Sequence, residues 1–181
     1  MRKVLFILGQ LSDDDVRWLS STGIRERIAA GRTLIEEGRT IDSMYLLLDG
    51  KMSVSLKGIG VVATLSSGEI MGEMSLVDSR PPSASVRAET ECVVLTIPRR
   101  ALIAKLESDT GFAARFYKAI ATFLSDRLRG TVRRLGYGDK ANSLDEDVEI
   151  EGELDLSVLD NIHLAGARFE RMLKQLMGEA T

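Results

Sequence analysis

Residues 68–90 read GEIMGEMSLVDSRPPSASVRAET and contain two Gly-Glu pairs, a serine-rich run and a double proline. A helical turn that starts after Gly72 would direct the backbone amides of Met74, Ser75 and Leu76 toward an anion. Gly72 itself permits a close approach that a side chain would block. This stretch therefore predicts a pocket that holds a phosphate through its backbone.

Short apolar runs separated by glycines surround this stretch from residue 24 to residue 98. Their spacing of roughly 7 to 10 residues, with turn signals between them, indicates an all-β barrel or sandwich. Within this region, the run YLLLDGKMSVSL (residues 45–56) predicts a hairpin, because Asp49-Gly50 suits a two-residue type I′ turn.

Helices are predicted on both sides of the strands. Ser12 can cap a helix that begins DDDVRWLSS, with acidic residues in its first turn. Residues 99–106 read as a short helix, and a long amphipathic helix follows to about residue 135. Phe112, Phe116 and Phe123 are interpreted as packing residues of the long helix.

The amino-acid composition of the chain changes after residue 135. Residues 136–156 are polar and acidic and are predicted to be a linker. Residues 157–178 are predicted to be an amphipathic helix that packs on the barrel or on another subunit. Its apolar stripe consists of Leu159, Ile162, Ala165, Phe169, Met172, Leu173 and Leu176.

Composition excludes several classes of function. The chain has 181 residues and a formal net charge of −3, so no overall basic charge draws it to nucleic acid or to an anionic membrane. The single cysteine, Cys92, cannot form an internal disulfide, which together with the lack of a secretory segment or apolar span predicts a cytoplasmic protein. His163 is the only histidine, and no His/Cys cluster has metal-ligand spacing. We expect no enzyme activity, no metal site and no cofactor.

The stretch GEMSLVDSRPPSASVRA resembles the phosphate-binding cassette of the cyclic-nucleotide-binding domain family. The matching positions are Gly72, Glu73, Leu76, Pro81, Ala84 and Val86, with no gap. The resemblance covers about residues 5–135 and is to a catabolite activator protein-like effector domain without the helix-turn-helix. It implies an α+β, mainly β fold: a double-stranded β-helix, or jelly-roll-like β-roll, flanked by an N-terminal helix and C-terminal helices. Residues 1–135 would form this domain, with the β-roll at about 24–98 and helices at about 99–135.

The resemblance also implies a ligand, cAMP or cGMP, and roles for residues. Glu73 would accept a hydrogen bond from a ribose hydroxyl, and the hydroxyl of Ser83 could donate to the phosphate. Thr131 aligns near a base-contacting hydroxyl of some bacterial members. The amides of residues 74–76 would contact the phosphate.

One position departs from the family. Pro82 stands where the family has its phosphate-binding arginine, which supplies the strong charge-assisted contact of such sites. Arg80 and Arg87 are the candidate substitutes: Arg80 lies two residues earlier, and Arg87 lies on the strand after the cassette, on the same face as Ser83 and Ser85.

Two hypotheses about function remain. The chain is either a cyclic-nucleotide sensor that regulates a protein partner through its C-terminal helices, or a dimerisation or docking module that binds no cyclic mononucleotide or a different anionic ligand. In both, we expect a homodimer that binds neither DNA nor a membrane. Intact Gly72 and Glu73 favour the first hypothesis, and Pro82 favours the second.

Overall fold

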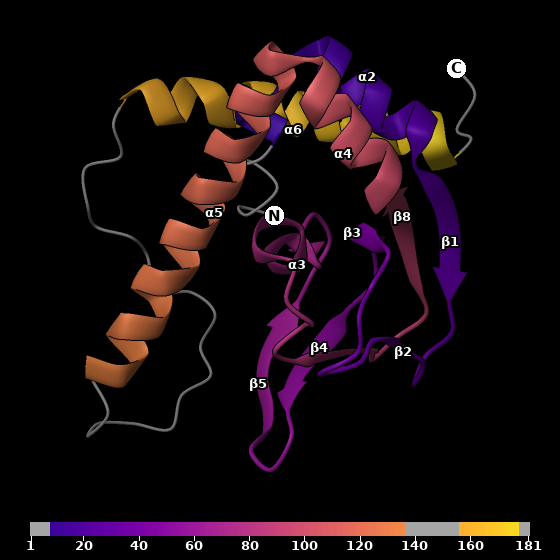
Figure 1. Ribbon diagram of the computed structural model, residues 1–181, viewed down its shortest axis with the longest axis vertical. Coiled ribbons are helices and arrows are strands. Elements are labelled where there is room, and N and C mark those ends of the chain that lie inside the picture. Colours follow the sequence, from indigo (N-terminus) through magenta and orange to yellow (C-terminus); the bar gives the residue numbers. More distant parts are fainter. Residues whose placement is uncertain (1–7, 137–155, 178–181) are drawn as a thin grey trace.

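The computed structural model, which describes residues 8–136 and 156–177, contains two antiparallel four-stranded sheets that form a roll (Figure 1). The first sheet, in spatial order, consists of β1 (Ile24–Ile28), β8 (Cys92–Pro98), β3 (Ser43–Asp49) and β6 (Ile70–Met71). The second consists of β2 (Thr33–Ile35), β7 (Ser85–Ala88), β4 (Met52–Leu56) and β5 (Gly60–Leu65). The predicted fold class, a mainly β roll flanked by helices, is confirmed.

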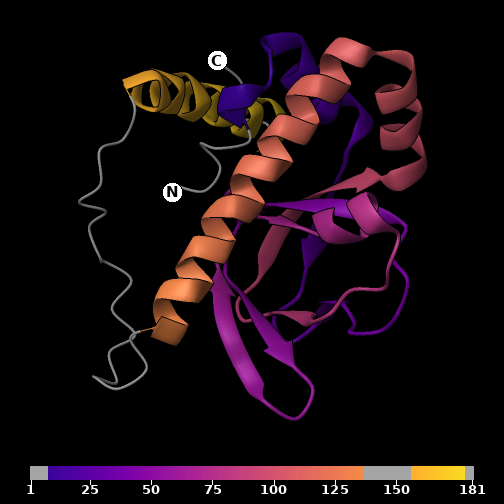
Figure 2. The same cartoon turned by 60° about the vertical axis from the view of Figure 1, so that its left-hand side comes forward.

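The helices are α2 (Asp13–Thr22), α3 (Glu73–Asp78), α4 (Arg99–Ser108), α5 (Thr110–Gly136) and α6 (Leu156–Met177). Helices α2, α4 and α6 gather at one end of the roll, and α5 runs from that end along the side of the roll (Figures 1 and 2). Ser12 caps α2 as predicted, and Asp15 completes a capping box by accepting from the Ser12 amide. A Cβ atom at Gly130 would meet nothing within 4 Å, so close packing does not require this glycine of α5.

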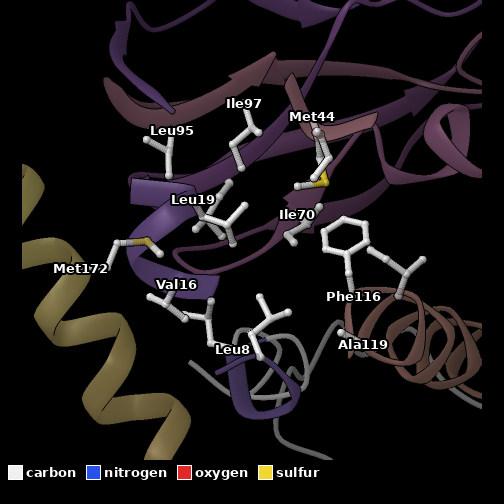
Figure 3. Close-up of a cluster of buried hydrophobic side chains, with 14 of the residues drawn as sticks. Leu8, Val16, Leu19, Met44, Ile70, Leu95, Ile97, Phe116, Ala119 and Met172 are labelled. Carbon is white, nitrogen blue, oxygen red and sulfur yellow. The ribbon is translucent and has the colours of Figure 1, made fainter. Parts of the chain in front are cut away.

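The central strands β3 and β8 of the first sheet are buried on both faces, which explains their continuous apolar runs, whereas the edge strand β1 is largely exposed. Alternate residues of β3 and β8, such as Leu46 and Leu95, pack toward the helices, while Leu47 and Val94 pack into the space between the sheets. The core under the helices takes side chains from α2, α5 and α6 as well as from the sheet (Figure 3). Phe112, Phe116 and Phe123 of α5 are fully buried there, as predicted.

The predicted hairpin around Asp49-Gly50 is wrong. β3 pairs with β8 and β6, whereas β4 pairs with β5 and β7 in the other sheet. Both edges of β3 are therefore taken, and the chain crosses between the sheets after Asp49. Gly50 is needed at this crossing, because it has a φ of 97° and a Cβ atom there would lie 2.6 Å from the Cys92 sulfur. The strand that does form a hairpin with β4 is β5.

The C-terminal helix folds back onto the roll end of the same chain. Ala165 and Met172 of its apolar stripe are buried in the core under the helices, with Phe169, Leu173 and Leu176 packed against it. Arg168 of α6 connects this helix to the N-terminal part of the chain. It donates to the Asp13 carboxylate at 2.6 Å and to the Leu8 carbonyl at 3.0 Å. The side chains of Leu159, Ile162 and His163, and residues 137–155 of the predicted linker, lie outside the described residues. Within the described ranges, no helix is long and apolar enough to cross a bilayer.

Candidate functional site

The predicted cassette folds as strand β6, a glycine and the short helix α3. Gly72 caps α3 with a φ of 84°, in the left-handed region that favours glycine. A Cβ atom at this position would lie 2.7 Å from Ile41 Cδ1 and 3.1 Å from the Ser43 carbonyl oxygen. Gly72 therefore allows α3 to begin close against the start of β3. The close approach of an anion to Gly72, which the sequence predicts, is a separate matter and stays a prediction.

Glu73, the first residue of α3, is a buried acid that pairs with the long helix. It is 2% exposed, and its Oε1 accepts a hydrogen bond of 2.7 Å from Arg127 Nη1 of α5. Burial raises the pKa of the Glu73 carboxyl, while the Arg127 charge and the amide of Glu73 itself act in the opposite direction. The Arg127 guanidinium also lies 4.9 Å from the centre of the Phe123 ring, in cation–π range. A buried acid of the cassette is thus bonded directly to the long helix.

The other residues of the first turn of α3 have different surroundings. Met74 is exposed, Ser75 is buried and Leu76 packs against the core under the helices. By helix geometry, the amides of the first turn, those of Glu73, Met74 and Ser75, have no carbonyl four residues earlier in the helix to donate to, although the Glu73 amide interacts with its own carboxyl. At the other end of α3, Arg99 of α4 donates to the Ser75 carbonyl at 2.6 Å.

The second half of the cassette is held by the loop after β2. The Gly38 amide donates to the Pro82 carbonyl at 2.9 Å, and the Glu37 amide donates to the Ser85 hydroxyl at 3.0 Å. Ser83, between these two contacts, is exposed. Pro82 is therefore held through its backbone carbonyl, in a contact that does not depend on its side chain.

Neither candidate substitute cation contacts Glu73 or the first turn of α3 in the interactions that the structure shows. Arg80 is 84% exposed, and its nearest acid is Asp78, at 3.9 Å. Arg87 Nε donates to the Gly31 carbonyl at 2.8 Å, in the loop between β1 and β2. On β7, Val86 and Ala88 point into the core between the sheets, so Arg87 lies on the outer face.

Thr131 lies one helical turn after Arg127 and therefore on the same side of α5. It is exposed, and its hydroxyl donates to the Arg127 carbonyl at 3.0 Å. Thr131 thus lies one turn beyond the contact between Glu73 and Arg127, and its role at the ligand stays a prediction.

The sequence interpretation missed Arg127 and Arg99. Residues 127–134 contain four arginines, Arg127, Arg129, Arg133 and Arg134, and nothing in their order selects one. Arg99 follows the last strand, where a basic residue reads as the start of a solvated helix. A buried glutamate early in the cassette does require a cation partner, and that requirement is the signal that could have directed attention to the long helix.

Comparison with known proteins identifies the family of one part of the chain. Residues 25–109 match the family model of the cyclic nucleotide-binding domain. A cAMP-dependent protein kinase regulatory subunit of Eremothecium gossypii is 35% identical over 95 residues, which are 52% of this chain and 21% of that protein. This chain therefore corresponds to about a fifth of that relative.

Solved structures show the same fold. A cyclic nucleotide-binding domain from Methylobacillus flagellatus superposes with a TM-score of 0.66 and 25% identity, over 78% of this chain and 85% of that one. The catabolite activator protein of Thermus thermophilus superposes with a TM-score of 0.59 and 23% identity, over 93% of this chain and 85% of that one. The family resemblance is confirmed for the part of the chain that the family model covers: residues 25–109 match the cyclic nucleotide-binding domain.

Proposed function

We propose that this chain is a non-enzymatic regulatory protein that binds a cyclic nucleotide in its β-roll and passes the binding event to its C-terminal helices. The observation that carries the proposal is the buried Glu73, at the start of α3 and bonded to Arg127 of α5. A ribose hydroxyl that donates to Glu73 would share this carboxylate with Arg127, so ligand and long helix would act on one group. The regulated partner is proposed to be a protein, in keeping with the net charge of −3.

The nucleotide would be cAMP or cGMP, and thermal unfolding tests this. At a nucleotide concentration 100 times the dissociation constant, binding stabilises the folded protein by about 2.7 kcal/mol, or about 5–10 °C for a chain of this size. We expect a shift of this size with one of the two nucleotides at millimolar concentration. Linear 5′-AMP serves as the control for unspecific effects of a charged nucleotide, and should produce no shift.

A Glu73→Gln variant tests the site itself. Glutamine keeps the shape of the side chain but loses the charge that accepts from Arg127 and the ribose, so the ligand-induced shift should fall to near zero. Binding to the wild type should also weaken as the pH falls through the raised pKa of Glu73, because the protonated carboxyl is a poorer acceptor. An unchanged shift in Glu73→Gln would remove this residue from the site, and no shift with either nucleotide in the wild type would contradict the proposal.

A second candidate function is a docking or dimerisation module that binds no cyclic mononucleotide. The observation that favours it is Pro82, since Arg80 is 84% exposed beside Asp78 and Arg87 donates to the Gly31 carbonyl, so neither replaces the missing arginine beside Glu73. Loss of a charged hydrogen bond costs about 1.5–3 kcal/mol, or roughly 10- to 100-fold in affinity. A wild type that forms dimers but shows no shift with cAMP or cGMP would support this candidate.

A homodimer through α5 is part of both candidates. Tyr117, Leu128 and Val132 are large apolar residues that lie exposed along one side of this helix. Leu128→Glu should raise the dissociation constant of the dimer about 30-fold or more, because it would bury a charge at the interface. Sedimentation over a concentration series measures this constant.

The control for this variant is Arg129→Glu, which places an acid about 100° round the same helix. It should leave the dimer largely intact. A dimer that is equally weakened by both changes, or by neither, would mean that the apolar side of α5 is not the interface.

A further inference from the structure

Helix α3 depends on contacts from outside itself. It has only six residues, too few for a stable helix in isolation. It ends at Ser79, whose φ of 58° and ψ of 15° lie in the left-handed region without the help of a glycine. The orientation of α3 is therefore imposed by its neighbours.

Arg99 provides the contact at the C-terminal end of α3. Its Nη1 donates to the Ser75 carbonyl at 2.6 Å, and its Nη2 donates to the Ser79 hydroxyl at 3.0 Å. A cation at this end of a helix is favourable, because the carbonyls there carry partial negative charge. The Ser75 carbonyl accepts from the Ser79 amide at 3.1 Å as well as from Arg99. One guanidinium thus binds both the last turn and the cap of α3.

Arg99 is itself held firmly. It is the first residue of α4, and its amide donates to the Asp42 carbonyl at 2.8 Å, just before β3. Together with Gly72 and Leu76 it lines a hollow of only about 10 Å³ behind α3. The side of α3 that faces Arg99 is therefore closely packed.

Hydrogen bonds at Asp109 connect helix α4 to α5. The Asp109 carboxylate between them accepts from the Phe112 amide at 2.8 Å and from Lys105 at 2.8 Å. α5 then returns to the cassette through Arg127 and Glu73. Arginines from two successive helices therefore hold the two ends of α3.

We propose that Arg99 is a positioning residue, which fixes α3 in the orientation that presents Glu73 and the first-turn amides, and which couples any movement of α3 to α4. The coupling rests on the proposed function, because it requires a ligand at the cassette. The role of Arg99 in fixing the orientation of α3 does not rest on the proposed function, and it can be measured without ligand.

Hydrogen exchange of the full chain tests both parts, with Arg99→Met as the variant and Arg100→Met as the control. Methionine keeps most of the length of Arg99 but donates no hydrogen bond, and Arg100 is the exposed neighbour on the same helix. Without ligand, amide exchange in residues 73–79 should be about tenfold faster in Arg99→Met and unchanged in Arg100→Met. With saturating cAMP or cGMP, the wild type and Arg100→Met should show slower exchange in residues 99–108.

In Arg99→Met this slowing should be absent even at saturation, and nucleotide affinity should be about tenfold lower. A purely structural role would lower the melting temperature but leave the slowing in α4 intact, which would overturn the coupling. Equal exchange of residues 73–79 in the two variants would overturn the fixing of α3. If Arg99→Met does not fold, Ser79→Ala removes one of the two bonds and should give a smaller change of the same kind. A wild type that binds neither nucleotide would refute the proposed function, while the ligand-free comparison would still decide whether Arg99 holds α3.

Discussion

Replacement of Gly72 by alanine is expected to lower the free energy of unfolding by about 2–4 kcal/mol. Two costs add at this position. A non-glycine residue is strained at a φ of 84°, and the new Cβ atom would lie 2.7 Å from Ile41 Cδ1 and 3.1 Å from the Ser43 carbonyl oxygen. The end of the Ile41 side chain can move aside, but the Ser43 backbone belongs to β3 and can give way only if α3 shifts. Urea denaturation at neutral pH measures the loss.

Gly58 offers a matched control for this prediction. Its φ is 82°, almost the same as that of Gly72, but a Cβ atom there would meet nothing within 4 Å. Gly58→Ala should therefore cost only the backbone strain, about 1–2 kcal/mol. Equal losses in the two variants would show that α3 does not need the close approach of Gly72 to β3. We also expect that Gly72→Ala, but not Gly58→Ala, weakens nucleotide binding, since only the former displaces the cassette.

The second large effect is expected at Asp15, the buried acid that joins α2 to α5. Arg115 donates to its two carboxylate oxygens at 2.6 and 2.9 Å, and the Ser12 amide donates at 2.7 Å. Asp15→Asn should lower the free energy of unfolding by about 2–3 kcal/mol at neutral pH. This is less than the 3–5 kcal/mol of a fully buried pair, because the Arg115 side chain is 40% exposed and partly screened by water.

The effect should depend on pH in a defined direction. Burial acts to raise the pKa of Asp15, but the hydrogen bonds from Arg115 and Ser12 outweigh it and hold the pKa below its ordinary value of 3.8. A carboxyl with a lowered pKa contributes stability above its unfolded pKa, and this stability is lost as the pH falls through the folded pKa. The difference between wild type and Asp15→Asn should therefore be full at pH 6–7 and shrink below about pH 4.

Asp14 is the control, since it lies next to Asp15 in the same helical turn. Its pair with Arg17 is on the surface, with side chains that are 83% and 69% exposed. Asp14→Asn should thus change the free energy of unfolding by less than about 1 kcal/mol. Similar losses in both variants, or a loss in Asp15→Asn that persists unchanged at pH 3, would contradict the assignment of the stabilisation to the buried pair.

Much of the fold could be predicted from the sequence, because the deciding signals are local. Glycines at regular intervals separate the apolar runs, Ser12 with Asp15 closes a capping box, and the phenylalanines of α5 follow a helical period. The cassette is also local, since Gly72 and Glu73 lie next to each other and their spacing to Pro81 and Val86 is set within one short segment. Local patterns of this kind report the conformation of a segment but not its neighbours.

Strand pairing and the partners of the cassette were decided by the tertiary structure. Asp49-Gly50 is a good local signal for a hairpin. However, β3 forms hydrogen bonds with β8 on one edge and β6 on the other, so β4 pairs within the other sheet. Arg127 is chosen from four arginines in residues 127–134 only because α5 passes Glu73 at that point. Arg99 donates to Ser75 and Ser79, which lie 24 and 20 residues earlier in the chain. The sequence by itself determined the roll, its helices and the cassette, because these follow from short-range periodicity and turn chemistry. The tertiary structure alone decided which cations the cassette contacts. Such contacts join residues far apart in the chain and depend on how whole elements pack.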